Sequence, residues 1–288
     1  MEINKQNKNL LAQQNDRFWG AVEIPFTESK EEIWLQLESK IDFEKTNTKI
    51  IKFNWIKYAS AAIVVLFLST SFFSRFYTET ISTKYGETKT HQLPDGSKVL
   101  LNVDSKLSYT PYWFNINRSL SFEGEAFFEV MKGKKFIVNS SFGTTEVLGT
   151  SFNVFSRENN YKVFCKIGLV KVTNINTREN VLLHPNQMAS LEINTLKFTD
   201  KATVKEQLAW QFGDFYFKKT PLQNALSTLE KEYNIKVSTN FSLKRDYLYT
   251  GFFRKHKNAF DALQIVCLSF DLKVQKINEK EYSVSNTD

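Results

Sequence analysis

The chain has 288 residues and a formal net charge of +7, and it contains only two cysteines. Two cysteines exclude the disulfide framework of a small secreted domain, so we expect Cys165 and Cys267 to be buried, unpaired thiols. The first 57 residues carry equal numbers of basic and acidic side chains, so the basic excess lies beyond them, scattered in short runs such as residues 132–135. Scattered charge of this kind argues against direct binding of nucleic acid.

A helix over about residues 30–45 is predicted in the N-terminal segment, residues 1–57. Ser29 and Glu32 have the spacing of a capping box, which closes the first turn of a helix. The apolar side chains that follow recur at helical spacing and form one stripe: Ile33, Trp34, Leu37 and Ile41. This stripe either packs on another helix of the same short segment or docks onto a partner protein.

The segment 58–77 is predicted to cross a membrane once. Residues 58–74 contain no charged side chain, and Phe76 and Tyr77 extend the apolar run past Arg75. Such a run is near the lower length limit for spanning a hydrocarbon core. The segment starts too far from the N-terminus for a secretory signal. The alternative is a buried core helix, which would usually show a polar face that this segment lacks.

The orientation of this span follows from the distribution of lysine and arginine. Five lysines lie shortly before it and three basic residues shortly after it: Lys40, Lys45, Lys49, Lys52 and Lys57 against Arg75, Lys84 and Lys89. Positive charge concentrates on the cytoplasmic side of membrane spans. We therefore expect residues 1–57 in the cytoplasm and the C-terminal bulk in the periplasm.

Residues 78–204 are predicted to form an all-β domain. The run 120–130 alternates apolar and polar side chains, and Pro94-Asp95-Gly96 marks a turn between two strands. Further short strand-like runs follow at close spacing, without a long helical pattern between them. They cover residues 136–139, 145–149, 152–156, 161–168, 170–175 and 188–193.

No catalytic or metal-binding pattern stands out in this β-rich stretch, so we expect neither an enzyme nor a cofactor. Glu123 and Glu125 are neighbours on one strand face, as two catalytic carboxylates could be, but alternating glutamates are ordinary on the exposed face of a strand. The three histidines have no metal-ligand spacing: His91, His184 and His256.

Residues 205–288 are predicted to form a small α+β domain. The pattern reads strand, helix, strand, strand, helix, strand, with one extra strand at the end. Thr220 is the expected N-cap of the first helix and Asn234 its end, and Asn258 is the expected N-cap of the second helix.

Three motifs of the central region resemble a known family. The strings LPDGSKVLLNVDSKLSY, LSFEGEAFFEV and VLGTSFNV are similar to those of the FecR-like family of single-pass anti-sigma factors. Residues 210–286 resemble the small domain at the C-terminus of FecR-like proteins of the Bacteroidetes type. We therefore expect a membrane-anchored, multi-domain protein with a short helical cytoplasmic segment, one transmembrane helix, an all-β domain that is β-helix or solenoid-like, and the small α+β domain.

The resemblance implies a relay across the bacterial inner membrane. A TonB-dependent outer-membrane transporter would present its signalling domain to the periplasmic part of the chain. Regulatory proteases would then free the cytoplasmic segment, and an extracytoplasmic-function sigma factor would be released or activated. Membrane lipid is the remaining partner that this arrangement implies.

Two binding surfaces follow as expectations. The sigma factor would dock on Ile33, Trp34, Leu37 and Ile41. The transporter signalling domain would dock on the strand-like run near residue 250, through Tyr247, Tyr249, Phe253, Arg254 and Lys255, because edge strands of small domains readily accept another strand.

The Gly149-Thr150 bond carries one further possibility. Some members of the family cleave themselves at a Gly-Thr bond when the threonine hydroxyl attacks the preceding carbonyl, and this bond matches. The alternative is that Gly149 simply allows close packing or a bulge in a strand.

A different class of protein fits the same sequence pattern. A membrane-anchored periplasmic module that binds glycans or proteins, with no sigma factor, could use exposed Tyr and Phe side chains of the β-rich domain. The two classes differ in their genetic neighbourhood, because only the first needs an adjacent sigma-factor gene.

Overall fold

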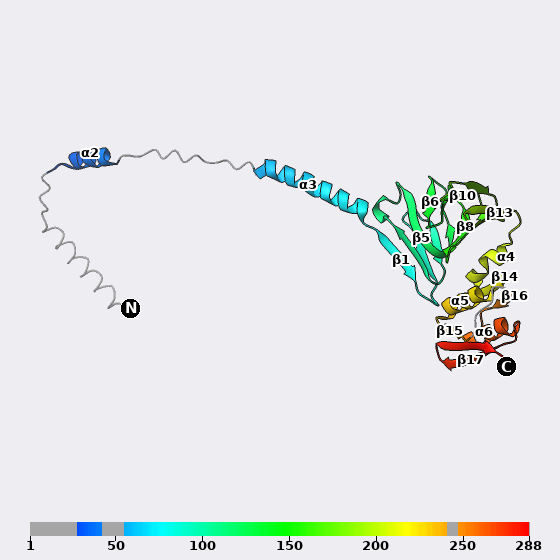
Figure 1. The fold of residues 1–288 in the computed structure, drawn as a ribbon. Helices are drawn as coiled ribbons and strands as arrows, with labels where there is room; N and C mark the ends of the chain where they lie inside the picture. The colour runs from blue at the N-terminus through cyan, green and yellow to red at the C-terminus, as the bar shows by residue number, and fades with distance from the viewer. Residues whose placement is uncertain (1–27, 42–54, 241–246, 288) are drawn as a thin grey trace, which may run out of the picture. The chain divides into compact units, whose positions relative to one another are not determined.

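The computed structural model describes residues 28–41, 55–240 and 247–287 (Figure 1). The chain divides into two compact units, residues 1–59 and residues 60–288, and each is described by itself.

The first unit contains helix α2 (Lys30–Lys40). Its N-terminus is the predicted capping box: the Ser29 hydroxyl accepts a hydrogen bond from the Glu32 amide at 3.3 Å, and the Glu32 carboxylate accepts from the Ser29 amide at 2.8 Å. The prediction of a helix reaching residue 45 is wrong, because Ile41 is the C-cap and leaves helical geometry. Residues 42–45 lie outside the described residues.

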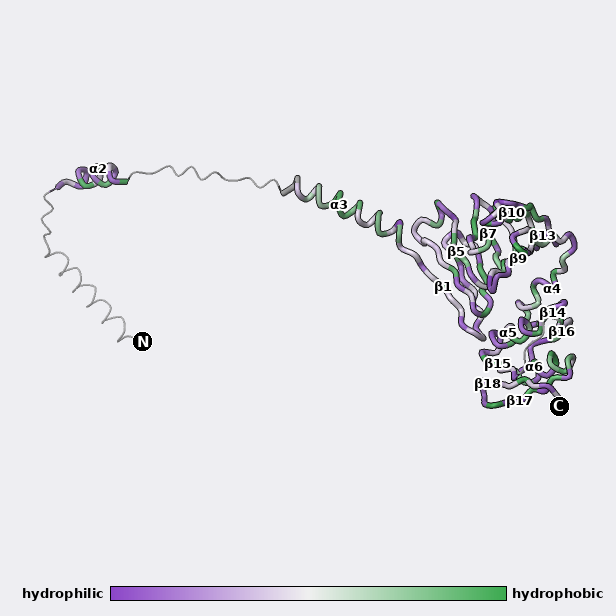
Figure 2. The backbone as a smooth tube through the Cα atoms, viewed as in Figure 1, coloured by the Kyte–Doolittle hydropathy of each residue, from purple (hydrophilic) through white to green (hydrophobic). Residues whose placement is uncertain are grey.

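Helix α3 (Trp55–Phe76) has 22 residues and rises about 33 Å, enough to cross a hydrocarbon core of about 30 Å. Its segment Tyr58–Phe76 is long and apolar enough for a membrane span, and none of it is buried inside the protein. Figure 2 shows the helix coloured largely as hydrophobic. Hydroxyl side chains of the helix bond back to carbonyls of the same helix, as from Thr70 to Leu66 at 2.7 Å, and such bonds lower the cost of placing a hydroxyl in an apolar environment.

Residues 79–199, here termed the β-domain, form 13 strands that are connected in one hydrogen-bonded sheet. Most of the predicted strands are present with small shifts at their ends, and β1, β4, β11 and β13 were not anticipated. The strands are β1 (Glu79–Thr83), β2 (Lys89–Gln92), β3 (Lys98–Leu101), β4 (Ser105–Tyr109), β5 (Arg118–Glu129), β6 (Phe136–Asn139), β7 (Gly143–Val147), β8 (Ser151–Arg157), β9 (Asn160–Ile167), β10 (Val170–Asn174), β11 (Asn180–Leu183), β12 (Gln187–Glu192) and β13 (Thr195–Thr199); a 3-10 turn, η1 (Pro111–Trp113), precedes β5.

The long strand β5 divides these strands into two layers. Its first half pairs with β4 and β6, and its second half pairs with β3 and β8. The first layer continues through β7, β10 and β11, and the second through β9, β12 and β13. After β5 the chain therefore visits the two layers alternately, two strands at a time, while it advances along the stack.

The domain is all-β as predicted, but its strand pairing is not that of the expected β-helix or solenoid-like form. All ladders of the β-domain are antiparallel except that between β5 and β6, whereas a regular β-helix is built from parallel ladders. The antiparallel ladders join successive strands, as β6 with β7, and also strands that are separated along the chain, as β5 with β8 and β9 with β12.

The transfer of β5 between layers occurs at Gly124, which has φ +112°. A Cβ atom at this position would lie 2.6 Å from Cα of Ser105. The Ser105 hydroxyl accepts a hydrogen bond from the Glu125 amide at 3.0 Å and donates to the Glu125 carbonyl at 3.0 Å. A serine side chain thus replaces the partner strand where β5 leaves one layer for the other.

The core of the β-domain lies between the two layers. It contains the inward residues predicted from the alternation of β5, including Leu120, Phe122, Ala126 and Phe128. Phe128 and Phe152 stack with their ring centroids 5.1 Å apart. Cys165 belongs to this core as a free thiol, as predicted, and burial raises its pKa to about 11.

The outer face of the second layer is also covered. Helix α4 (Val204–Leu208) and the 3-10 turn η2 (Ala209–Phe212) follow β13. Leu208 packs there with Phe127 and Phe164, both buried. Phe127 therefore faces away from the main core, as the alternation of the run 120–130 implies, and its face is covered rather than solvent-exposed.

Residues 214–286, here termed the C-terminal domain, contain five strands and two helices in the order β14 (Asp214–Pro221), α5 (Leu222–Tyr233), β15 (Lys236–Thr239), β16 (Leu248–Arg254), α6 (Ala259–Leu268), β17 (Leu272–Asn278) and β18 (Glu281–Asn286). Strands β14 and β16 form one sheet, and β15, β18 and β17 another. The two helices share one buried cluster with both sheets, and this cluster includes the free thiol of Cys267.

The ends of these helices test three predictions. Asn234 ends α5 with φ +52°, and the Asn258 side chain caps α6 by accepting from the Asp261 amide, as predicted. The prediction of Thr220 as N-cap is wrong. Thr220 lies within β14, where its hydroxyl accepts a bond from the Lys218 amide, and Pro221 occupies the cap position without a side-chain bond.

Gly124→Ala is expected to destabilise the β-domain by about 3–5 kcal/mol, because it adds backbone strain and an overlap with Ser105. Gly96→Ala is the matched control: Gly96 also has positive φ, +85°, but a Cβ there would meet only Met131 at 3.7 Å. The control should lose only about 1–2 kcal/mol. Thermal unfolding of the full chain in detergent measures both, and equal losses would contradict the role of the bend.

Candidate functional site

Helix α2 presents the predicted apolar stripe to its surroundings. Trp34 is 69% exposed, Leu37 47% and Ile41 48%, and no residue of α2 is buried. Leu35, which the stripe did not include, is also exposed. Ile33 is half-buried. Within residues 28–41 the structure therefore leaves the apolar face of α2 open.

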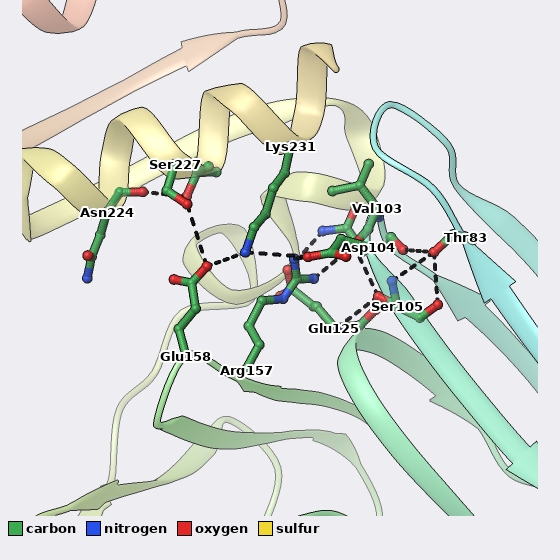
Figure 3. Close-up of polar contacts among 12 residues, drawn as sticks. Thr83, Val103, Asp104, Ser105, Glu125, Arg157, Glu158, Asn224, Ser227 and Lys231 are labelled. Carbon is green, nitrogen blue, oxygen red and sulfur yellow. Dashed lines mark hydrogen bonds and ion pairs between the residues drawn. The ribbon is translucent and has the colours of Figure 1, made fainter. Parts of the chain in front are cut away.

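A polar site lies where α5 of the C-terminal domain meets the end of the β-domain at the bend of β5 (Figure 3). The Lys231 ammonium group on α5 contacts the Glu158 carboxylate and lies 3.5 Å from the Asp104 carboxylate. The Lys231 carbonyl also accepts a hydrogen bond from the Gly86 amide at 2.7 Å. One residue of the C-terminal domain thus joins three separate loops of the β-domain.

Arg157, next to Glu158 in the chain, holds the loop of Asp104 from the side of the β-domain. Its guanidinium donates to the Val103 carbonyl at 3.0 Å and lies 3.9 Å from the Asp104 carboxylate. Asp104 and Glu158 have φ of +51° and +53°, a conformation that is uncommon for residues other than glycine. The two carboxylates that Lys231 contacts are therefore carried on tightly turned backbone at the ends of β-strands.

Glu125 lies beneath this junction. Its carboxylate accepts hydrogen bonds from the side-chain amides of Asn102 at 2.9 Å and Asn153 at 3.1 Å. Burial raises the pKa of Glu125, and Arg157 and the two amides oppose that rise. The expectation that Glu125 is an ordinary exposed strand residue is therefore wrong, whereas Glu123, on the other side of the bend, is exposed.

A cleft of about 460 Å³ opens beside Glu125, between the second layer of the β-domain and β14. Asn153 and Trp210 line it, and the Asn153 amide oxygen and the Trp210 indole nitrogen are buried without a hydrogen-bond partner in the described residues. Among those residues, no group of His, Cys, Asp or Glu side chains is arranged to hold a metal ion.

Strand β16 sorts the predicted transporter-binding residues into two sets. Tyr249 and Phe253 are buried in the core of the C-terminal domain, so their side chains are not available to a partner. Leu248 and Phe252 occupy the opposite, exposed face, and Arg254 follows them. The Lys255 ammonium pairs with the Glu232 carboxylate at 3.2 Å. Tyr247 is half-buried and packs against Phe270.

The Gly149-Thr150 bond has a structural role of its own. A Cβ on Gly149 would lie 2.6 Å from Cα of Lys132, so close packing alone requires a glycine here. The Thr150 hydroxyl donates to the Leu169 carbonyl at 3.1 Å. This geometry supports the packing interpretation of the glycine, and self-cleavage stays a prediction.

Sequence reasoning missed the Lys231 junction. The contact between Lys231 and Glu158 joins residues 73 positions apart, and Lys231 occupies a position on α5 that is typical of a solvated lysine. The only signal in the sequence was the turn at Asn159-Asn160, which places Glu158 at the end of a strand.

Two family matches cover most of the folded residues. Residues 79–171 match the FecR protein family, and residues 214–284 match the FecR C-terminal family. Among curated proteins none matches the chain.

Two crystal structures, each described as that of a candidate anti-sigma factor from Parabacteroides distasonis, at 2.50 and 1.65 Å resolution, are similar to this chain. The sequences are 28% and 27% identical, with TM-scores of 0.66 and 0.64. The similarity covers 74% and 73% of this chain and 100% of each of the other chains. These matches support an anti-sigma regulator rather than an enzyme, and the chain belongs to the FecR family.

Proposed function

We propose that this chain is a single-pass anti-sigma factor that relays a signal from a TonB-dependent outer-membrane transporter to an extracytoplasmic-function sigma factor. The observation that carries the proposal is the position of α3. This unburied apolar helix separates α2, with its open apolar face, from the residues that match the FecR families. A chain built this way can bind one partner on each side of the bacterial inner membrane.

The proposed orientation places residues 1–57 in the cytoplasm, because lysines are more frequent before α3 than after it. A reporter enzyme that is active only in the periplasm should be active when fused after Asp288 and silent when fused at Lys52. The reverse pattern would end the relay proposal, since the FecR residues could then not meet a transporter.

The proposed sigma-factor surface is the stripe of α2. Burial of a large apolar side chain contributes roughly 1.5–3 kcal/mol, so Trp34 and Leu37 together could supply much of a complex's stability. Trp34→Ala with Leu37→Ala should weaken co-purification of the sigma factor by about 100-fold or more.

Leu35→Ala is the control for this experiment. Leu35 is 65% exposed on α2 but points away from Leu37, so its truncation should leave binding unchanged. Membrane insertion should be the same for both variants. Undiminished binding of the double variant would show that the stripe serves packing within residues 1–57.

The proposed receiving surface for the transporter signalling domain is the outer face of β16. Leu248 is 49% and Phe252 42% exposed, and the Lys205 ammonium lies 4.1 Å from the centre of the Phe252 ring. Within the described residues β16 pairs only with β14, so its other edge can accept a strand.

Once the transporter signalling domain is bound, regulated proteolysis near the membrane would free the N-terminal segment.

Leu248→Asp with Phe252→Asp should abolish capture of the purified signalling domain while capture of the sigma factor continues. Leu268→Asp is the matched control, because Leu268 is a 76% exposed apolar residue at the end of α6. Removal of residues 205–288 should reproduce the loss. If the truncated chain still captures the signalling domain, the receiving surface lies in the β-domain instead.

A further inference from the structure

The register of the strands determines which loops share the end of the β-domain where α3 enters. Arg118 is paired with Phe136, and Phe136 with Val147, so the starts of β5 and β6 and the end of β7 lie at one level. Glu79, the first residue of β1, is paired with Tyr109, which is paired with Leu120 near the same level. The loops around residues 112–117, 131–135, 148–149 and 167–169 therefore border the end from which the chain continues into α3.

Contacts connect these loops into one continuous surface, here termed the α3 edge. The Tyr77 and Tyr112 rings lie 5.7 Å apart. Arg118, buried in a salt bridge with Asp95, donates to the carbonyls of Met131 at 2.7 Å and Lys134 at 2.6 Å. The Gly133 amide donates to the Leu148 carbonyl at 2.8 Å, and the Thr150 hydroxyl reaches Leu169.

The α3 edge exposes large apolar side chains at its loop tips. Each is between 49% and 68% exposed: Tyr112, Ile116, Met131, Leu148, Ile167 and Leu169. They are carried on separate loops rather than in a groove. Isolated tips of this kind can enter a soft, extended surface such as a bilayer interface, whereas a small-molecule ligand requires a concave pocket.

Basic side chains accompany these tips. The loop 131–135 reads MKGKK, with three exposed lysines and no acidic residue, and Lys166 and Lys171 lie on the neighbouring strands. Lys135 pairs with Glu146 at 2.9 Å. Lysines beside apolar and aromatic side chains suit a bilayer surface with anionic headgroups.

The short connection between α3 and β1 leaves the α3 edge little freedom to move away from the end of the helix. Only Tyr77 and Thr78 separate α3 from β1, so Glu79 lies at most about 11 Å along the chain from the end of the helix. At that end, the Arg75 guanidinium lies 5.7 Å from the centre of the Trp113 ring, an aromatic setting typical of a membrane–water interface.

We propose that the α3 edge rests on the bilayer, with its apolar tips at the headgroup boundary and its lysines on anionic lipid. The proposal rests on the proposed membrane span of α3. It adds a second attachment to the membrane, which fixes the orientation of the β-domain and directs the C-terminal domain away from the bilayer.

Site-specific quenching in nanodiscs tests the proposal with the full chain. Leu148→Cys and Ile167→Cys are labelled with a polarity-sensitive fluorophore, and Thr177→Cys provides the control, because residue 177 is exposed beyond the opposite end of β10. The wild-type chain, treated with the same fluorophore, measures the background labelling of the two native thiols, Cys165 and Cys267, which are buried. Lipids that carry a spin label near the headgroup act as the quencher.

Quenching at positions 148 and 167 should exceed that at 177 several-fold in nanodiscs with phosphatidylglycerol. It should fall with zwitterionic lipid, and also when Lys132, Lys134 and Lys135 are all replaced by Glu. Equal quenching at the three positions, while the chain co-elutes with nanodiscs, would overturn the docking but leave the span intact. A chain that does not co-elute with nanodiscs would overturn the span and the docking together. If the cysteines at 148 and 167 are protected from labelling in cells but are not quenched by lipid, this edge binds a protein partner instead, and the proposal fails.

Discussion

The bend of β5 at Gly124 is the constraint on which the rest of the β-domain depends. One strand serves both layers because a residue without a side chain passes over Ser105, whose hydroxyl then bonds the backbone of Glu125. Every strand after β5 is added to a layer that β5 has already begun. The core between the layers therefore exists only if the backbone turns at this point.

The same bend separates two ends of the β-domain that make different contacts. Around the turn, Asp104 and Glu158 meet Lys231 of the C-terminal domain, and Glu125 is held by two amides beneath them. At the other end of the strands the chain leaves toward α3. The β-domain therefore presents distinct contacts at each end, to the C-terminal domain at one and toward α3 at the other.

Local features of this fold could be predicted from the sequence, and those that depend on distant neighbours could not. The capping box at Ser29, the helix end at Asn234 and the alternation within β5 each depend on residues close in the chain. Alternation shows which side chains share a face, but not what covers that face. It therefore could not reveal that α4 buries Phe127 or that the side chain of Tyr249 points inward. The junction at Lys231 joins residues too far apart for any pattern to link them.

The position of the short strand β1 determines how a force on α3 would reach the β-domain. Strand β1 is the first element after α3 and, among the residues that the structure describes, it pairs only with β4, through five residue pairs from Glu79 to Thr83. Tension between α3 and the C-terminal domain would run along the strands, because the two attach at opposite ends of the β-domain. The hydrogen bonds of a ladder lie across its strands, so such a pull loads them together in shear rather than one after another. The β1–β4 ladder is thus placed to transmit a force, and it is also the first ladder that a sufficient force would open.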